Sequence, residues 1–144
     1  MNRINIITLG TEDINNALSF YTALGFESTV EGDAEEPSIV FFKNEGTRLA
    51  LYPLEKLASD ISSTHPPYRQ AGFPGFTLAH NVKNKEEVDL LLQKAAQAGA
   101  EIVKSPQPTD WGGYSGYFRD LDGYYWEVAY GDIWTFDESN MLVL

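Results

Sequence analysis

The sequence predicts an α+β fold built from two βαβββ modules. Each half begins with a strand, continues into a capped helix and ends in three further strands. Asp13 and Asn84 occupy matching cap positions, and Gly46 and Gly123 occupy matching hairpin turns. Such an internal repeat defines the architecture. Because each half is too small to bury both faces of its sheet, we expect the two sheets to combine around a shared concave surface, with helices outside.

The first module can be followed residue by residue. Residues 3–10 alternate weakly and are rich in Ile and Thr, which is typical of a strand. Asp13 is a typical N-cap, apolar residues recur behind it at helical spacing, and Gly25 stands where a helix-ending glycine is expected. Three short strands separated by polar turns are expected at residues 26–31, 38–43 and 48–52.

A connector separates the modules. A short helix is expected over residues 54–60, and the proline-containing run after it cannot continue a helix. The second module is expected to contain, in order, a strand at 75–82, a helix capped by Asn84 and ended by Gly99, a strand at 101–104, a loop at 106–111 and a hairpin at 112–130. We therefore expect one domain with module one at about 1–53, a connector at about 54–74, module two at about 75–131 and a C-terminal tail at 132–144.

The hairpin contains the most unusual charge in the chain. Two aromatic-rich runs flank Asp120-Leu121-Asp122-Gly123, and Gly123 can adopt the positive φ that the turn requires. Side chains alternate faces along a strand, so Glu127 falls on the face opposite Trp126 and Val128. A carboxylate in so apolar a strand needs a metal, a cation, a ligand or a proton to offset its desolvation.

Composition excludes several classes of function. The 144 residues carry a formal charge of −11, so no basic stripe is available to neutralise nucleic acid phosphates. The chain has no cysteine, which excludes disulfides, thiolate metal sites and cysteine nucleophiles. No run approaches the roughly 18 apolar residues of a membrane span. We expect a soluble cytoplasmic protein with no nucleic acid or membrane partner. The apolar tail is expected to pack against the domain or across a dimer interface.

Three stretches resemble a known family, over essentially the whole chain. They are residues 9–26, the Ala98-Gly99-Ala100 helix end, and above all residues 113–128, which include Asp120-Leu121-Asp122-Gly123 and Trp126-Glu127-Val128. The chain resembles the vicinal oxygen chelate superfamily, which includes glyoxalase I, bleomycin and fosfomycin resistance proteins and extradiol dioxygenases. The resemblance implies paired βαβββ modules forming a half-barrel, usually in a dimer.

The resemblance also implies positions for metal ligands. Metal-using members place His or Glu on the first and last strands of each module, which here correspond to Asn5, Ala50, Phe76 and Glu127. Only Glu127 is a strong ligand, whereas a divalent ion needs several nitrogen or oxygen donors. His80 shares a strand face with Phe76 and could point into the cavity, or it is a polar strand-end residue. We expect no metal and no cofactor.

The remaining candidates concern a ligand pocket. Arg48 is either a counter-charge for Glu127 or an exposed arginine. Trp111, before two glycines, either closes over a ligand or belongs to an ordinary hairpin entry. Aromatic residues could line an apolar pocket. The full set of candidate ligand-binding residues is Asn5, Arg48, Ala50, Tyr52, Phe76, His80, Trp111, Tyr114, Tyr125 and Glu127.

Three functions remain open. In the first, a homodimer binds a small organic molecule in the sheet cavity and performs no chemistry. In the second, Glu127 is a catalytic acid or base of a lyase or isomerase related to lactoylglutathione lyase, with His80 as an aid. An interaction module without a ligand is a third possibility. Replacing Glu127 with Gln weakens binding in the first case and abolishes turnover, with binding retained, in the second.

Overall fold

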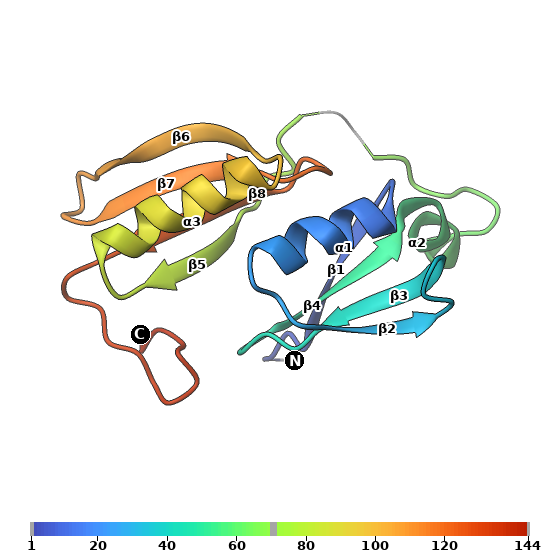
Figure 1. Ribbon diagram of the computed structural model, residues 1–144. Coiled ribbons are helices and arrows are strands. Elements are labelled where there is room, and N and C mark those ends of the chain that lie inside the picture. Colours follow the sequence, from blue (N-terminus) through green and yellow to red (C-terminus); the bar gives the residue numbers. More distant parts are fainter. Residues whose placement is uncertain (1, 70–71, 144) are drawn as a thin grey trace. The chain divides into compact units, whose positions relative to one another are not determined.

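The computed structural model describes residues 2–69 and 72–143, and the chain forms two compact units divided between Phe73 and Pro74 (Figure 1). Each unit contains a four-stranded mixed sheet and one long helix. The predicted α+β fold of two βαβββ modules is therefore confirmed. Residues 70–71 of the predicted connector lie outside the described part of the chain.

The first unit has the strand order β1-β4-β3-β2. Its elements are β1 (Ile6–Thr11), α1 (Ile14–Ala23), β2 (Ser28–Gly32), β3 (Pro37–Phe42), β4 (Arg48–Pro53) and α2 (Leu54–Ile61). Strand β1 runs parallel to β4, and the other neighbours are antiparallel. The predicted short helix of the connector is α2, which follows β4 directly and lies close to β1.

The second unit repeats this arrangement with the strand order β5-β8-β7-β6. Its elements are β5 (Leu78–Val82), α3 (Lys85–Gln97), β6 (Glu101–Pro108), β7 (Tyr114–Arg119) and β8 (Tyr125–Tyr130). Strand β5 is parallel to β8, as β1 is to β4. The hairpin predicted over residues 112–130 is β7–β8.

Both long helices begin and end where the sequence predicts. The Asp13 carboxylate accepts from the backbone N–H of Asn15 and Asn16, and the Asn84 side chain accepts from Glu87 N–H. These bonds satisfy donors that have no partner within the helix. Gly25 and Gly99, one residue after the C-caps, have φ of 103° and 105°, a conformation that favours glycine.

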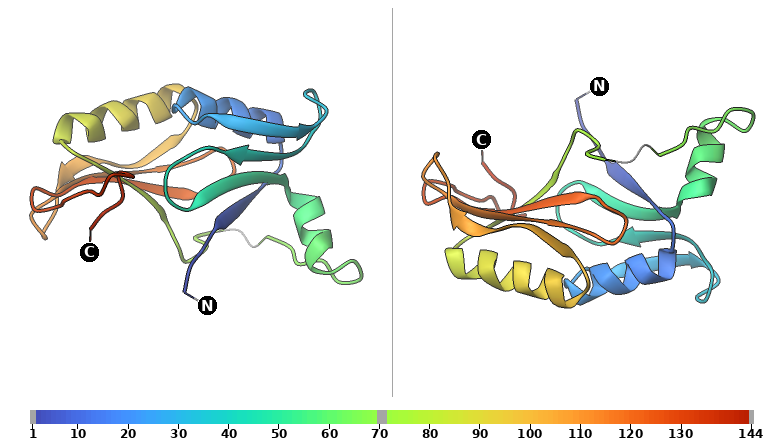
Figure 2. Two further views of the ribbon diagram at one scale, coloured as in Figure 1. Left: turned by 90° about the horizontal axis from the view of Figure 1, so that it is seen from below. Right: turned by 90° about the horizontal axis from the view of Figure 1, so that it is seen from above.

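One helix covers one face of each sheet, which Figure 2 shows for α1 and α3. In the first unit, Tyr21 of α1 packs on Phe42 with ring centroids 5.3 Å apart. In the second, a Cβ at Gly116 of β7 would lie 2.5 Å from Leu92 Cδ2 of α3, so Gly116 faces this helix. Trp126 and Val128, buried on the same side, complete the helix-facing core of the second sheet, as predicted.

Strand β6 is longer than the sequence predicts. A strand was expected only at 101–104 and a loop at 106–111, yet β6 continues to Pro108. The register shifts between Ile102 and Lys104 and again between Lys104 and Gln107. Because β6 is an edge strand, its prolines need not donate to a neighbour, and the irregular register accommodates them. Strand β5, by contrast, begins only at Leu78.

The two parallel strand pairs, β1–β4 and β5–β8, have the same register. Ala50 lies directly beside Thr8, and Glu127 lies directly beside Ala79. Ala50 and Glu127 are also the residues that the sequence repeat aligns. The repeat therefore extends from the order of elements to the pairing of individual residues.

The tail contacts the second unit. Trp134 stacks on Trp111 with ring centroids 5.3 Å apart, and Lys83 Nζ donates to Asn140 Oδ1 at 2.8 Å. The predicted packing against the domain is therefore seen for this part of the tail, whereas Leu144 lies outside the described residues. Among the helices described, none has both the length and the apolar character needed to cross a membrane.

Candidate functional site

The candidate site is one row of side chains across the second sheet. Lys104 pairs with Tyr117, Tyr117 pairs with Glu127, and Glu127 pairs with Ala79, so one residue comes from each strand. Directly paired residues point to the same side of a sheet. Because the neighbouring Gly116 faces α3, this row lies on the opposite face, and we call it the Glu127 row.

The centre of the Glu127 row is a hydrogen bond between two strands. The Tyr117 hydroxyl donates to Glu127 Oε1 at 2.6 Å, and both side chains are half-buried. Partial burial and this bond to the carboxylate raise the pKa of Tyr117 to about 12. The phenol therefore stays protonated at neutral pH and continues to donate, which holds the carboxylate in place.

Lys104 stands at the edge-strand end of the row. Its Nζ lies 3.5 Å from Ser115 Oγ and 5.5 Å from the centroid of the Tyr117 ring. The contact with the ring is a cation–π interaction. At the other end of the row, Ala79 is small and exposed, so no side chain from β5 covers Glu127 there.

Of the candidate residues predicted in the second unit, only Tyr125 and Glu127 itself lie on the face of the Glu127 row. Tyr125 is two residues before Glu127 on β8 and pairs with Arg119. His80 instead pairs with Val128, on the α3 side. The expectation that His80 could share a cavity with Glu127 is therefore wrong: it lies on the opposite face of the sheet.

Tyr114 and Phe76 are also placed away from Glu127. The Tyr114 hydroxyl donates to Asp89 Oδ1 of α3 at 2.9 Å, and this bond raises the pKa of Tyr114. The Phe76 ring lies 6.4 Å from the ring of Tyr124, which precedes β8. Tyr114 and Phe76 therefore each contact a residue other than Glu127, and their part in a ligand pocket stays a prediction.

Trp111 belongs to a hydrogen-bonded loop. Thr109 N–H donates to Gly113 O at 3.0 Å, and Gly113 N–H donates back to Thr109 Oγ1 at 3.0 Å. The indole stacks on Trp134 and leaves 53% of the residue exposed. These contacts describe a hydrogen-bonded entry to the hairpin, and closure of Trp111 over a ligand stays a prediction.

The predicted residues of the first unit have separate local roles. The Arg48 guanidinium donates to the Asn44 carbonyl of the β3–β4 turn. The Tyr52 hydroxyl bonds to Asp60 of α2, which raises the pKa of Tyr52. Ala50 is fully buried in β4, and the Asn5 carbonyl accepts from Arg48 N–H at 3.0 Å. These contacts give each residue a structural partner within its own unit.

Four positions correspond to metal ligands in the resemblance, namely Asn5, Ala50, Phe76 and Glu127, and only Glu127 of these carries a carboxylate. In the strand pairing, Ala50 lies beside Thr8 and Glu127 lies beside Ala79. Across residues 2–69 and 72–143, no group of three or more His, Cys, Asp or Glu side chains is placed to hold a metal.

Sequence reasoning missed Tyr117, Lys104 and Ala79. Tyr117 was part of the predicted hairpin, and strand alternation with the turn at Gly123 would have placed it opposite Glu127. Lys104 gave no such signal, because the register of β6 is irregular on both sides of it. Ala79 gave no signal, because its place beside Glu127 depends on the register of β5 against β8.

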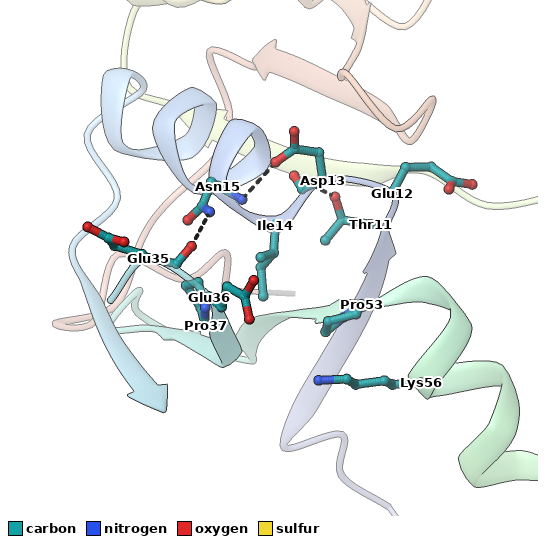
Figure 3. Close-up of a pocket in the computed structure, with 10 residues that line it drawn as sticks. All are labelled: Thr11, Glu12, Asp13, Ile14, Asn15, Glu35, Glu36, Pro37, Pro53 and Lys56. Carbon is teal, nitrogen blue, oxygen red and sulfur yellow. Dashed lines mark hydrogen bonds between the residues drawn. The ribbon is translucent and has the colours of Figure 1, made fainter. Parts of the chain in front are cut away.

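The first unit contains a separate pocket of about 340 Å³ (Figure 3). It is lined by Thr11, Glu12, Asp13, Ile14, Asn15, Glu35, Glu36, Pro37, Pro53 and Lys56. Asp13 is the α1 cap, and Asn15 Nδ2 donates to the Glu35 carbonyl at 2.8 Å. None of the candidate ligand-binding residues lines this pocket, and its Asp13 and Asn15 side chains form hydrogen bonds at the start of α1.

Two βαβββ units with parallel outer strand pairs, and a carboxylate on the last strand facing away from the helix, define a class of duplicated α+β proteins. The chain belongs to the glyoxalase/bleomycin resistance protein/dioxygenase superfamily, whose family model matches residues 3–128. The predicted relationship is therefore confirmed.

Solved structures agree with this membership. A glyoxalase-related enzyme from Fulvimarina pelagi is 26% identical, with a TM-score of 0.85 over 100% of this chain and 99% of that chain. A lactoylglutathione lyase from Agrobacterium tumefaciens is similar in fold, with 23% identity and a TM-score of 0.68 over 95% and 99% of the two chains. A comparison with curated proteins finds no match.

Proposed function

We propose that the protein binds a small organic molecule at the Glu127 row without a metal ion. The observation that carries this proposal is the 2.6 Å hydrogen bond from the Tyr117 hydroxyl to Glu127 Oε1, on the sheet face opposite α3. It fixes a half-buried carboxylate in one orientation. Fixed polar groups within an apolar surface give a small-molecule site its specificity.

The second carboxylate oxygen is the proposed contact for the ligand. Among the described residues, none donates to Glu127 Oε2, while Oε1 is held by Tyr117. A half-buried acceptor gains from a hydroxyl or amine donor, because a charge-assisted hydrogen bond offsets its partial desolvation. The residue of β5 directly beside Glu127 is Ala79, which has only a methyl side chain.

The test uses two variants and a panel of small aromatic alcohols, acids and amines. Binding is followed by NMR through the backbone amides of β7 and β8. We expect at least one compound to shift these amides, and Glu127→Gln to weaken its binding by about tenfold, the effect of losing roughly 1.4 kcal/mol. Glu86→Gln, at an exposed position of α3, is the matched control and should bind as the wild type does. Shifts confined to other regions would overturn the proposal.

A second candidate is a lyase or isomerase in which Glu127 transfers a proton. The same hydrogen bond favours it, because Tyr117 leaves one oxygen of an oriented carboxylate available to a substrate. His80 cannot assist directly, since it lies on the other face of the sheet. Loss of turnover in Glu127→Gln with unchanged binding would select this candidate, whereas weakened binding selects the first.

We further propose that the protein is a cytoplasmic homodimer. The dimer is supported by the fact that members of the superfamily usually dimerise. It is also supported by exposed apolar residues on the edge strand β1, such as Ile6 at 47% exposure. Native mass spectrometry tests the dimer, and a monomer at micromolar concentration would contradict it.

A further inference from the structure

The Glu127 row carries one charge of each sign, separated by Tyr117. Lys104 lies on β6, and Glu127 lies on β8, with β7 between them. Neighbouring strands are roughly 4.8 Å apart, so the two backbones are separated by about 10 Å. Tyr117 fills this interval, with its ring near the lysine and its hydroxyl on the carboxylate.

Lys104 has no anionic partner. Lys104 is half-buried as a residue, the contacts of its ammonium group with Ser115 Oγ and the Tyr117 ring are both uncharged, and it forms no ion pair with any described residue. Arg119, two residues after Tyr117 on β7, differs because it is paired with Glu101. A partly desolvated ammonium group without a counter-ion favours an incoming anion.

The neighbouring carboxylate does not supply this counter-ion. Glu127 accepts a hydrogen bond from the Tyr117 hydroxyl, and it forms no ion pair with Lys104 in the described structure. The row therefore offers two separate contacts: a cation at Lys104 and an acceptor at Glu127. A single ligand can use both only if it carries an anionic group and a hydrogen-bond donor.

We propose that the ligand is a small organic acid that also carries a hydroxyl group, with the acid bound at Lys104 and the hydroxyl donating to Glu127. This proposal rests on the function proposed above and names its ligand class. The acid and the hydroxyl group of the ligand should be separated by about the width of one aromatic ring. Together with the lysine side chain, such a ligand spans the roughly 10 Å between the backbones of β6 and β8.

Three probes of matched shape test this class. 4-Hydroxybenzoate carries both groups, 4-hydroxybenzyl alcohol lacks the anion, and 4-methoxybenzoate lacks the donor. Dissociation constants are measured by NMR on the full chain. We expect 4-hydroxybenzoate to bind about tenfold more tightly than either of the others, since each removed contact is worth roughly one charge-assisted hydrogen bond.

Variants then assign each preference to a residue. Lys104→Met should remove the preference for the acid and retain that for the hydroxyl, and Glu127→Gln should do the reverse. Lys94→Met, at an exposed position near the end of α3, is the matched control for the lost charge and should change neither preference. Dispersed amide spectra establish that each variant is folded.

The outcomes separate this inference from the function on which it rests. Equal binding of the neutral alcohol and the hydroxy acid, with both weakened by Glu127→Gln, would overturn the ligand class and leave binding at Glu127 in place. The same holds if other compounds of the larger panel shift β7 and β8 while 4-hydroxybenzoate does not. If no compound of either set shifts these strands, both proposals are overturned.

Discussion

The two units have the same backbone pattern and different chemistry on it. The row of the first unit that corresponds to the Glu127 row consists of Thr8, Ala50, Phe41 and Thr29. It contains no charge, and Ala50 within it is fully buried. The second unit has Ala79, Glu127, Tyr117 and Lys104 at these places. Duplication thus supplied one scaffold twice, and the candidate site lies in only one copy.

The helix-facing sides differ as well. Val40 in the first sheet pairs with Leu51, as Gly116 in the second pairs with Val128. Val40 is fully buried, whereas Gly116 lets Leu92 of α3 and the Lys104 carbonyl approach closely. A glycine in a strand often marks such an approach. The second helix therefore lies on a position without a side chain, and the first on a packed valine.

The largest expected effect on stability comes from changing Gly116 and Val40, which occupy matching places in the two sheets. Gly116→Val would place atoms where a Cβ is already 2.5 Å from Leu92 Cδ2 and 2.9 Å from the Lys104 carbonyl oxygen. Overpacking against backbone should lower the free energy of unfolding by about 3 kcal/mol. Val40→Ala, which leaves a cavity at the matching place, should cost about 2 kcal/mol. Chemical denaturation measures both, and a harmless Gly116→Val would contradict the close approach.

The next largest expected loss of stability concerns the turns of the two hairpins. The buried Asp120 accepts from the N–H groups of Asp122 and Tyr124 at 3.1 and 2.7 Å. Asp120→Ala leaves these donors without their carboxylate and should cost roughly 2–3 kcal/mol. In the first unit, the half-buried Asn44 accepts from Leu49 N–H at 3.1 Å, and Asn44→Ala should cost roughly 1 kcal/mol. Thermal melting of both variants measures the difference, and equal losses would show that burial of the turn is unimportant.

The raised pKa of Tyr117 predicts that the protein loses stability at high pH. Its pKa is about 12 in the folded chain against 10.0 ordinarily, so the folded state holds this proton more tightly. The resulting stability is present below pH 10 and is lost as the pH rises towards 12. Tyr117→Phe should lose this part of the pH dependence, and Glu127→Gln should move the titration of Tyr117 back towards 10.

Ultraviolet absorbance near 295 nm, taken as the difference between wild type and Tyr117→Phe, isolates the titration of this one phenol. Phe41→Leu, which changes the ring at the corresponding place in the first unit, is the control and should leave the alkaline titration unchanged. A Tyr117 titration at its ordinary pKa would mean that neither its partial burial nor its bond to Glu127 persists in solution.

The smallest expected effect concerns an ion pair at the sheet edge. Arg119 is paired with Glu101, and both side chains are largely exposed, at 44% and 58%. In the first unit, Lys43 N–H donates to the Glu27 carbonyl at 2.8 Å, but their side chains form no ion pair in the described structure. Glu101→Gln should change stability by less than about 1 kcal/mol, and Glu27→Gln by less still. A larger loss at Glu101, measured by denaturation at low salt, would contradict this ranking.

The sequence by itself determined the fold and the repeat. Asp13 and Asn84 could be recognised as caps because capping is a contact between residues two or three apart. The β7–β8 hairpin followed from alternation and from Gly123, since both act within a few residues. Glu127 stood out for the same reason: its neighbours on one strand are apolar.

The tertiary structure alone decided what surrounds Glu127. Which residue of β5 lies beside Glu127 depends on the register of a parallel pair joined by a long connection, and that residue is Ala79. The same register puts His80 on the α3 side, and the irregular edge strand brings Lys104 level with Tyr117. Contacts within an element are encoded locally, whereas a site across four strands exists only once their registers are fixed.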